Sequence, residues 1–576
     1  MENFKFSEIV IKNREFVKLF EEQKKIKIKI LSNLTLTILR EVLLFELFNQ
    51  NIPSEIEIGD YDNFVQESIN DQAEVYIIFW ETINIVDNIF YKINNWDDNE
   101  IENLILKTKK DIQFLFNNLK NTPLILFNNF TSVHHSSYSS HETKIEKLAY
   151  DLNTYINENK PLNTQIIDTN KIFTRLGLNN LIDSRFYFTT KTIYSLDFYK
   201  EYVKFINNKL LKINGKLKKV LIVDCDNTIW GGVLGEEGFN RIEMDTNTNK
   251  GGIFSIIQHL LIDANKNGIL ICICSKNNFD DVIEVFENHK SMILKKENIT
   301  IFKVNWENKV SNIKQISKEL NIGLDSFIFI DDSPFEINNV KQFLPEVALL
   351  QVPDNLNDYP KFLMEKLSYY FIPNTTNEDR IRGKLYIENN IRKVELESHD
   401  SIDSYLKSLE MEIQISENDI CNIERISQLT QKTNQFNLTT KRYTETEIKN
   451  FMNSKTHNVF SFNVSDKFGK NGLTAVVIIE LQDFENAKID SFLMSCRIIG
   501  RNIEYFICEY VINFLKEKNI FLIHSDFHKT IKNSQVSDFF DKCGFKLIEH
   551  EDNKKKYLFD NYCNFPNPIK YINIRK

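Results

Sequence analysis

The chain has 576 residues, too many for one hydrophobic core, so about three domains are expected. Apolar residues make up 42% of the sequence, which is enough for globular packing. The formal net charge is −9 and no basic tract stands out, which argues against nucleic acid as the main partner.

The N-terminal residues lack the pattern of a secretory signal, in which a positively charged start precedes an apolar stretch. The apolar runs are too short and too often interrupted to span a membrane. The eight cysteines form no CxxC pair, and thiols and imidazoles do not cluster at zinc-finger spacing. These features predict a cytoplasmic protein with free thiols, no membrane association and no structural zinc site.

The first third of the chain predicts an α/β domain. After a helical lead-in over residues 1–24, short apolar runs alternate with helical stretches in the domain expected over 25–190. The predicted strands are 27–31, 56–58, 75–79 and 124–127. This alternation indicates a parallel sheet. A helical connector is expected over 191–217.

The most informative segment follows the apolar run 220–223, in the domain expected over 218–374. The run predicts a buried parallel strand, and the acids Asp224 and Asp226 come directly after it. Open α/β sheets place their chemistry at the carboxyl ends of such strands. Asp224 is expected to act as nucleophile and metal ligand, and Asp226 to move protons and bind the metal. Thr228 is expected to support the loop and bind phosphate through its backbone.

Polar residues also follow the later predicted elements of this domain. Ser275 ends the strand 269–274 and is expected to donate to phosphate oxygens, although it could simply cap a helix. Lys309 starts a helical stretch and is expected to neutralise a phosphoryl group, although it could be a surface charge. Asp331 ends the strand 327–330 and is expected to hold Mg²⁺ together with Asp224. Asp332 could either support that ion or cap the next helix.

The rest of the chain predicts a linker helix over 375–400, a domain over 401–550 and a C-terminal extension over 551–576. In the last domain, strands are expected at 476–481, 487–493 and 521–523, with a helix at 501–517. No long insertion separates Asp226 from Ser275, so a large cap domain over the acidic site is not expected.

The order of these motifs resembles the haloacid dehalogenase (HAD) phosphotransferase superfamily. Within it, the chain is similar to the FkbH-like family (subfamily IIIC) from about residue 25 to about residue 550. The segments that carry the similarity are 226–238, 275–277, 331–336, 432–438 and 493–501. Cys225 departs from the family, which usually has an apolar residue there.

The resemblance implies a multidomain α/β protein. An SGNH-hydrolase-like domain would come first, then a HAD core with a Rossmann-like parallel sheet and no large cap, then a GNAT-like α+β domain. In the first domain the nucleophile would fall near Ser32. That fold normally needs an Asp-x-x-His late in the domain, whereas the segment 183–186 here contains Asp183 and no histidine. A non-hydrolytic binding role is therefore expected for this domain.

The resemblance also implies an activity. FkbH-like proteins are expected to transfer a glyceryl unit from 1,3-bisphosphoglycerate to the phosphopantetheine arm of an acyl carrier protein, with loss of phosphate, for polyketide-type or related biosynthesis. The implied cofactor is Mg²⁺, and the implied donor is a phosphorylated glycerate. Two alternatives stay open at this point: a plain HAD phosphatase of small molecules, and a non-catalytic scaffold that binds a carrier protein.

Cys496 has two interpretations. It comes at a predicted strand end beside Ser495 and Arg497, and Arg497 could favour the thiolate and bind phosphate. The cysteine would then carry the glyceryl group as a thioester. The alternative is a buried core cysteine, which is common in proteins. The flanking arginines, Arg497 and Arg501, favour the nucleophile.

Overall fold

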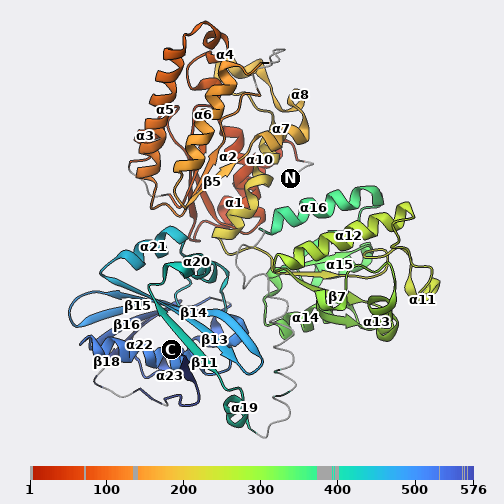
Figure 1. Ribbon diagram of the computed structural model, residues 1–576, viewed down its shortest axis with the longest axis vertical. Helices are drawn as coiled ribbons and strands as arrows, with labels where there is room; N and C mark the ends of the chain where they lie inside the picture. Colours follow the sequence, from red (N-terminus) through yellow and green to blue (C-terminus); the bar gives the residue numbers. More distant parts are fainter. Residues whose placement is uncertain are drawn as a thin grey trace. The chain divides into compact units, whose positions relative to one another are not determined.

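The computed structural model describes residues 4–69, 73–133, 141–372, 392, 395, 401–530, 532–560, 562, 565–566 and 568–575. The chain divides into two compact units (Figure 1). One comprises residues 1–214 and 443–447, and the other comprises residues 215–442 and 448–576. Apart from Arg392 and Glu395, the linker helix predicted over 375–400 lies outside the described residues.

The first unit is built on a five-stranded parallel sheet with the strand order β2-β1-β3-β4-β5. Its strands are short and almost fully buried in the middle of the sheet, as expected for strands covered by helices on both faces. Its elements are α1 (Phe6–Leu19), β1 (Ile26–Ser32), α2 (Thr37–Asn49), β2 (Ser54–Ile58), α3 (Phe64–Glu67), β3 (Val75–Phe79), α4 (Ile89–Lys92), α5 (Asp98–Asn118), β4 (Leu124–Asn128), α6 (Lys144–Asn159), β5 (Thr164–Ile167), α7 (Asn170–Leu176), α8 (Leu178–Leu181), α9 (Tyr187–Thr190) and α10 (Leu196–Ile213).

Two segments that the sequence placed outside this domain are part of it. Helix α1 packs on α2, where Phe16 contacts Phe45 and Phe48 through their rings. Helix α10 packs on α2 and α7, and Phe198 and Tyr202 on it are fully buried. The predicted lead-in and connector are therefore wrong as separate segments, because their apolar faces complete the core of the first unit.

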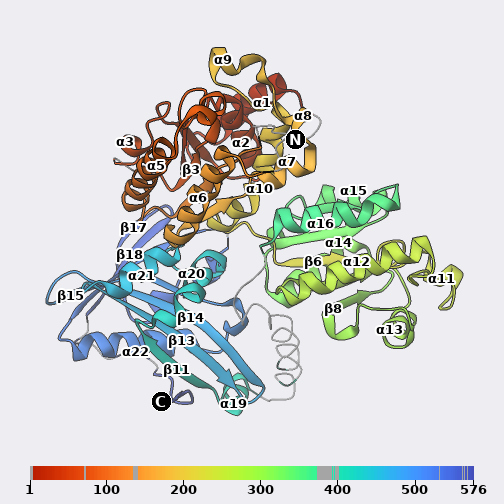
Figure 2. The same cartoon turned by 45° about the horizontal axis from the view of Figure 1, so that its top comes forward.

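The second unit begins with another five-stranded parallel sheet, of order β10-β9-β6-β7-β8. Helices α12, α13 and α16 supply the apolar core on one face, and α14 and α15 supply it on the other. Figure 2 shows α12 and α14 on opposite sides of β6. The elements are β6 (Val220–Val223), α11 (Leu234–Glu237), α12 (Asn249–Lys266), β7 (Leu270–Ser275), α13 (Phe279–Asn288), β8 (Ile299–Val304), α14 (Lys309–Leu320), β9 (Phe327–Asp331), α15 (Pro334–Phe343), β10 (Ala348–Gln351) and α16 (Tyr359–Tyr370).

The C-terminal part of the second unit is built on a mostly antiparallel sheet in the order β17-β18-β16-β15-β14-β13-β11-β19. Helices α20 and α22 lie on opposite sides of this sheet (Figure 2). The elements are α19 (Ile402–Ser408), β11 (Glu412–Glu417), α20 (Ile423–Lys432), β12 (Phe436–Asn437), α21 (Glu445–Asn453), β13 (His457–Asp466), β14 (Gly469–Leu481), β15 (Asn486–Met494), α22 (Ile503–Glu517), β16 (Leu522–His528), α23 (Phe539–Lys542), β17 (Lys546–Glu551), β18 (Lys554–Asp560) and β19 (Asn573–Arg575).

The C-terminal extension predicted over 551–576 is wrong, because this stretch supplies two strands of the sheet. Strand β18 pairs with both β16 and β17, and β19 pairs with β11 at the other edge. Tyr557 and Phe559 on β18 are buried in the same core as α22. The sequence did not predict these strands, because the many charged residues of the segment obscure its alternation of apolar and polar positions.

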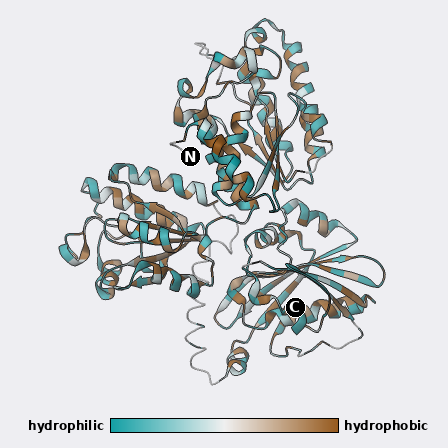
Figure 3. Ribbon diagram, turned by 180° about the vertical axis from the view of Figure 1, so that it is seen from behind, coloured by the Kyte–Doolittle hydropathy of each residue, from teal (hydrophilic) through white to brown (hydrophobic). Residues whose placement is uncertain are grey.

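The hydropathy of the chain follows these layers. The strands at the centre of each sheet are hydrophobic, whereas the helices are hydrophilic on their outer faces (Figure 3). Among the described residues, no helix is long and apolar enough to cross a membrane.

Candidate active site

A pair of carboxylates lies where β6 and β9 end. These strands run parallel with Val223 opposite Ile330, so Asp224 comes just after β6 and beside Asp331, the last residue of β9. The backbone N–H of Asp224 donates to the carbonyl of Ile330 at 3.1 Å. Both side chains are buried. The parallel register alone therefore brings together two acids that are more than a hundred residues apart in sequence.

Lys309 bridges the two carboxylates. It is the first residue of α14, and Asn308 caps this helix by accepting from the N–H of Ser311 at 2.7 Å. Its Nζ lies 2.9 Å from Asp224 Oδ1 and 2.5 Å from Asp331 Oδ2. All three groups are withdrawn from water, so each charge depends on the others for compensation.

The electrostatics of this group follow from burial and from the proximity of the acids. Burial, with a further contribution from the Asp224 charge, raises the pKa of Asp331 to about 7. Burial also raises the pKa of Asp224, although Lys309 opposes it. Burial by itself would lower the pKa of Lys309, but the two carboxylates outweigh it and the pKa is raised. The lysine is therefore held as a cation between the acids.

Asp226 is held in a different way. Its Oδ1 accepts from Trp230 Nε1 at 2.9 Å and from the N–H of Leu234 at 3.0 Å. Its Oδ2 accepts from Asn277 Nδ2 at 2.9 Å, and this amide also donates to Ser275 Oγ at 3.0 Å. Asn277 thus links the acid after β6 to Ser275, the last residue of β7. Asn277 lies in the family-like segment 275–277, but the sequence predicts no role for it, because an amide two residues past a strand end has no distinctive pattern.

Three carboxylates lie close enough to bind one metal ion. Asp224, Asp331 and Asp332 each offer an oxygen within 4.8 Å of the others. Carboxylate oxygens are the ligands that Mg²⁺ prefers. The sequence predicted Asp224, Asp226 and Asp331, but the hydrogen bonds of Asp226 direct its side chain elsewhere, and Asp332 completes the group instead. Asp226 lies outside this group of three oxygens, and its assignment as a metal ligand stays a prediction.

Thr228 and its neighbours form the turn that follows β6. Thr228 is completely buried, and its carbonyl accepts from Tyr359 Oη at 3.3 Å. Asn227 adopts a left-handed conformation with φ 49°, and its Oδ1 accepts from the N–H of Gly232, where φ is 94°. Asparagine and glycine tolerate these angles at little cost, which allows the chain to turn sharply after β6. Between β6 and β7 the chain then forms only α11 and α12, so no cap domain lies there.

Comparison with solved structures supports a phosphatase-like core. The N-terminal part of the protein BF1531 from Bacteroides fragilis, which contains a phosphatase domain and is complexed with Mg, is 28% identical to this chain. The similarity covers 65% of this chain and 100% of that one, with a TM-score of 0.55. This chain therefore contains a parallel-sheet α/β core that resembles a phosphatase domain.

Other solved structures show similarities that cover about a quarter of the chain. The GNAT domain of S. lividans PAT is 13% identical, covers 25% of this chain and 89% of its own, and has a TM-score of 0.22. The ribosomal-protein-S18-alanine N-acetyltransferase from Escherichia coli is 10% identical, covers 27% and 99%, and also has a TM-score of 0.22. No protein-family model and no curated protein matches the sequence.

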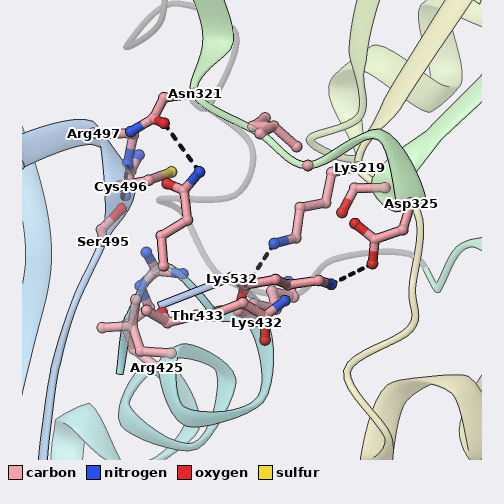
Figure 4. A pocket seen from close by; sticks show the side chains of 16 residues that line it. Lys219, Asn321, Asp325, Arg425, Lys432, Thr433, Ser495, Cys496, Arg497 and Lys532 are labelled. Carbon is pink, nitrogen blue, oxygen red and sulfur yellow. Dashed lines mark hydrogen bonds and ion pairs between the residues drawn. The ribbon is translucent and has the colours of Figure 1, made fainter. Parts of the chain in front are cut away.

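Cys496 lies in a second polar region, away from the acids. It follows the end of β15 in the short 3₁₀ turn Cys496–Ile498 and is half-buried. It lines a pocket together with Ser495 and Arg497 (Figure 4). Arg497 Nε donates to Ser495 Oγ at 3.2 Å. The predicted neighbours Cys496 and Arg497 therefore do share a cavity, within the second unit.

Arg501 has a structural role, contrary to the expectation from sequence. Its Nη1 lies 2.9 Å from Asp466 Oδ2, and Arg392 binds the same buried carboxylate at 2.7 Å. Its Nη2 donates to the carbonyl of Arg497 at 2.9 Å. The ion pair with Asp466 compensates the charge of Arg501, and of the two flanking arginines only Arg497 lines the Cys496 pocket.

Ser32, the nucleophile position implied for the first domain, is engaged in local structure. Its Oγ donates to the carbonyl of Phe79 at 3.0 Å and accepts from the N–H of Leu34 at 2.8 Å. These described contacts involve no histidine. Asp183, the other expected position, forms a 2.6 Å ion pair with Arg185. The SGNH-like assignment of this domain stays a prediction.

Proposed function

We propose that this chain is a Mg²⁺-dependent HAD-type phosphatase and glyceryl transferase that acts with an acyl carrier protein. The observation that carries the phosphatase half is the buried Asp224–Lys309–Asp331 group at the carboxyl ends of β6 and β9. The Mg-complexed phosphatase domain of BF1531 supports it. The glyceryl-transfer half rests on the FkbH-like motifs and on the pocket beside Cys496.

In the phosphatase step, Asp224 attacks the phosphorus of a phosphoester, and the bond from phosphorus to the ester oxygen breaks. Asp226 delivers a proton to the departing alkoxide, so it enters the step protonated. A water molecule then attacks the phosphorus of the aspartyl-phosphate, and Asp226 takes its proton. The bond from phosphorus to the Asp224 oxygen breaks, so that inorganic phosphate leaves and the Asp224 carboxylate is restored. Lys309, between the two acids, offsets the negative charge that the phosphoryl group brings.

The metal fits the acidic group. Asp224, Asp331 and Asp332 would hold Mg²⁺, because their three oxygens lie within 4.8 Å of one another. When bound, the ion would offset charge on the phosphoryl oxygens and orient the phosphate for attack. The residues of the chain supply everything else: the nucleophile, the proton and the neutralising lysine.

In the transfer step, the thiolate of Cys496 attacks the carbonyl carbon of the acyl phosphate of 1,3-bisphosphoglycerate. A carbon–sulfur bond forms, the bond from carbon to the phosphate oxygen breaks, and inorganic phosphate leaves. The pantetheine thiol of the carrier protein then takes the acyl group by thioester exchange and loses its proton, while the Cys496 thiol regains one. Arg497, in the same pocket, suits the phosphorylated donor.

A plain phosphatase of small molecules is the alternative that the same acidic group supports. The acids and Lys309 form one buried group of charges, and Ser275 is also buried, which argues against a purely structural scaffold. The two enzyme functions differ in whether a carrier protein gains mass.

Intact-mass analysis tests the proposal directly. A holo-acyl carrier protein would be incubated with the chain, Mg²⁺ and either 1,3-bisphosphoglycerate or 3-phosphoglycerate. The proposed function requires a glyceryl adduct on the carrier only with the acyl-phosphate donor. Phosphate release from phosphoesters with no adduct under any condition would leave the plain phosphatase.

A further inference from the structure

The pocket beside Cys496 has a strongly basic lining. It is a cavity of about 330 Å³ in the second unit, and its basic side chains are Lys219, Arg425, Lys432, Arg497 and Lys532. Among the described lining residues, Asp325 alone is acidic, and it pairs with Lys532. Five positive groups against one negative group leave a formal charge of +4 on the lining. A cavity with this excess of positive charge favours the binding of an anion.

Four of these basic side chains come from the C-terminal part of the unit. Arg425 and Lys432 stand seven residues apart on α20, with Leu429 between them, so all three lie on one face of that helix and line the pocket. Arg497 comes from the turn after β15, and Lys532 follows β16. Figure 4 shows Lys532 directed toward Asp325. These four side chains come from three separate segments, and Lys219, which precedes β6, adds a fourth segment to the cavity.

Neutral hydrogen-bonding groups complete the lining. Thr433, Asn434 and Gln435 follow α20, and Ser495 precedes the cysteine. Gln435 Nε2 donates to Asn321 Oδ1 at 3.0 Å, at the edge of the cavity nearest Cys496 in Figure 4. Hydroxyl, amide and guanidinium donors around a cationic cavity match the several acceptor oxygens of a phosphate group.

The pocket is separate from the acidic site. Lys219 and Ser326, which line it, precede β6 and β9, whereas Asp224 and Asp331 come at the other ends of the same strands. Five residues of extended chain separate Lys219 from Asp224, or about 16 Å at about 3.3 Å per residue. One phosphate group therefore cannot contact both places at once.

In the C-terminal sheet, the gap between the diverging ends of β15 and β16 is filled by the chain itself. Strands β15 and β16 pair only up to Ile489 and Ser525, and beyond that point the segment of β12 lies between them. The N–H of Leu438 donates to Phe492 at 3.1 Å, and the carbonyl of Leu438 accepts from the N–H of His528 at 2.8 Å. An extended ligand therefore finds no free strand edge between β15 and β16.

From this geometry we propose that the pocket is a second anion site, which binds a phosphate-bearing ligand next to Cys496 and away from the Asp224 centre. The shared chemistry is a phosphate ester, and two sources offer it: a small phosphorylated glycerate, or the phosphate of a phosphopantetheine arm. The proposal stands on the charge and shape of the cavity and does not require that the phosphatase be active.

Alkylation of Cys496 in the full-length protein provides the test. The protein would be treated with iodoacetamide, and the peptides containing Cys496 and the exposed Cys421 would be quantified by mass spectrometry. Saturating 3-phosphoglycerate or 4′-phosphopantetheine should slow alkylation of Cys496 by about tenfold or more, as expected for a ligand well above its Kd. Glycerate should not slow it, and Cys421 should react at the same rate throughout.

The outcomes separate the sources and can overturn the proposal. Protection by 3-phosphoglycerate alone identifies a small phosphoester, and protection by phosphopantetheine alone identifies the carrier arm. Equal protection by glycerate, or no protection by either phosphate, would refute the phosphate site.

Variants separate this site from the phosphatase. Replacing Lys432 and Lys532 by glutamine should abolish protection, whereas Lys516→Gln, at an exposed position on α22, should preserve it. Asp224→Asn should also preserve protection, even though it removes the proposed nucleophile. Loss of protection in Asp224→Asn would show that the two sites are not separate. An inactive phosphatase with intact protection would count against the proposed function only.

Discussion

At the scale of single residues, one buried lysine determines the character of the acidic site. Lys309 compensates Asp224 and Asp331 at the same time, at 2.9 Å and 2.5 Å. Removing one partner from a buried charge group typically costs about 3–5 kcal/mol, because the remaining charges lose compensation. Burying three charged groups costs stability, so stability does not explain this arrangement. The arrangement suits a site that receives a phosphoryl group.

Asp224→Asn should lower the rate of phosphate release by about a thousandfold or more, because it removes the nucleophile and a metal ligand together. Release of phosphate from 3-phosphoglycerate with Mg²⁺ measures the effect. Asp263→Asn, on the exposed face of α12, is the matched control and should keep the native rate. Near-native activity of Asp224→Asn would mean that another group is the nucleophile.

Ser32→Ala should leave ester hydrolysis unchanged at a low background rate. The hydroxyl of Ser32 is engaged with Phe79 and Leu34, and its described contacts include no base that could activate it. Hydrolysis of p-nitrophenyl acetate by the two proteins provides the measurement. Fast hydrolysis that disappears in the alanine variant would instead establish a working hydrolase in the first unit.

At the scale of elements, the first turn of α22 contains a buried acid that forms no ion pair with any of the described residues. Burial raises the pKa of Glu504 from its ordinary 4.5 to about 7, and neither its own backbone nor Lys542 offsets this. Its Oε2 has no hydrogen-bond partner among the described residues. The folded protein therefore keeps a proton that the unfolded chain releases above pH 4.5. The cost to stability grows as the pH rises from 4.5 to 7 and is complete above 7.

Glu504→Gln should therefore increase the free energy of unfolding at pH 8 by up to about 3 kcal/mol, and should change it little near pH 4. Chemical denaturation of both proteins at pH 4.5 and pH 8 measures the difference. Glu517→Gln, at the exposed end of the same helix, should show no such dependence. A benefit that is equal at both pH values would show that the ionisation of Glu504 is not its cause.

At the scale of the whole molecule, the two proposed chemistries use different parts of the second unit. The acids lie at the carboxyl ends of β6 and β9, and Cys496 follows β15 in the C-terminal sheet. A donor with two phosphate groups of different reactivity fits such a division. The acyl phosphate suits a thiol, and the phosphoester suits an aspartate nucleophile.

Cys496→Ala should abolish loading of the carrier protein while leaving Mg²⁺-dependent phosphatase activity close to native, because the thiol and the acids act independently. Loading would be followed by intact mass, and phosphatase activity by release of phosphate from a small phosphoester. Cys421→Ala, which removes an exposed thiol, should affect neither activity. Native loading by Cys496→Ala would show that transfer to the carrier is direct.

The sequence by itself determined the acids, the parallel sheets and the order of the motifs. Runs such as 220–223 and 327–330 are continuous apolar strands followed by acids, and local pattern is enough to recognise both. The same local patterns place Ser275 at the end of β7 and Lys309 at the start of α14. The strands at 476–481 and 487–493 fall within β14 and β15 for the same reason.

Tertiary structure alone decided which side chains meet. The parallel register of β6 and β9 brings Asp332 into the metal group, while three hydrogen bonds hold Asp226 apart from it. Long-range strand pairing places β18 and β19 in the C-terminal sheet, although their local sequence is charged. The convergence of basic residues on the Cys496 pocket depends on four segments that are distant in sequence. Local patterns fix each element, but register and packing, which join distant segments, decide what a site contains.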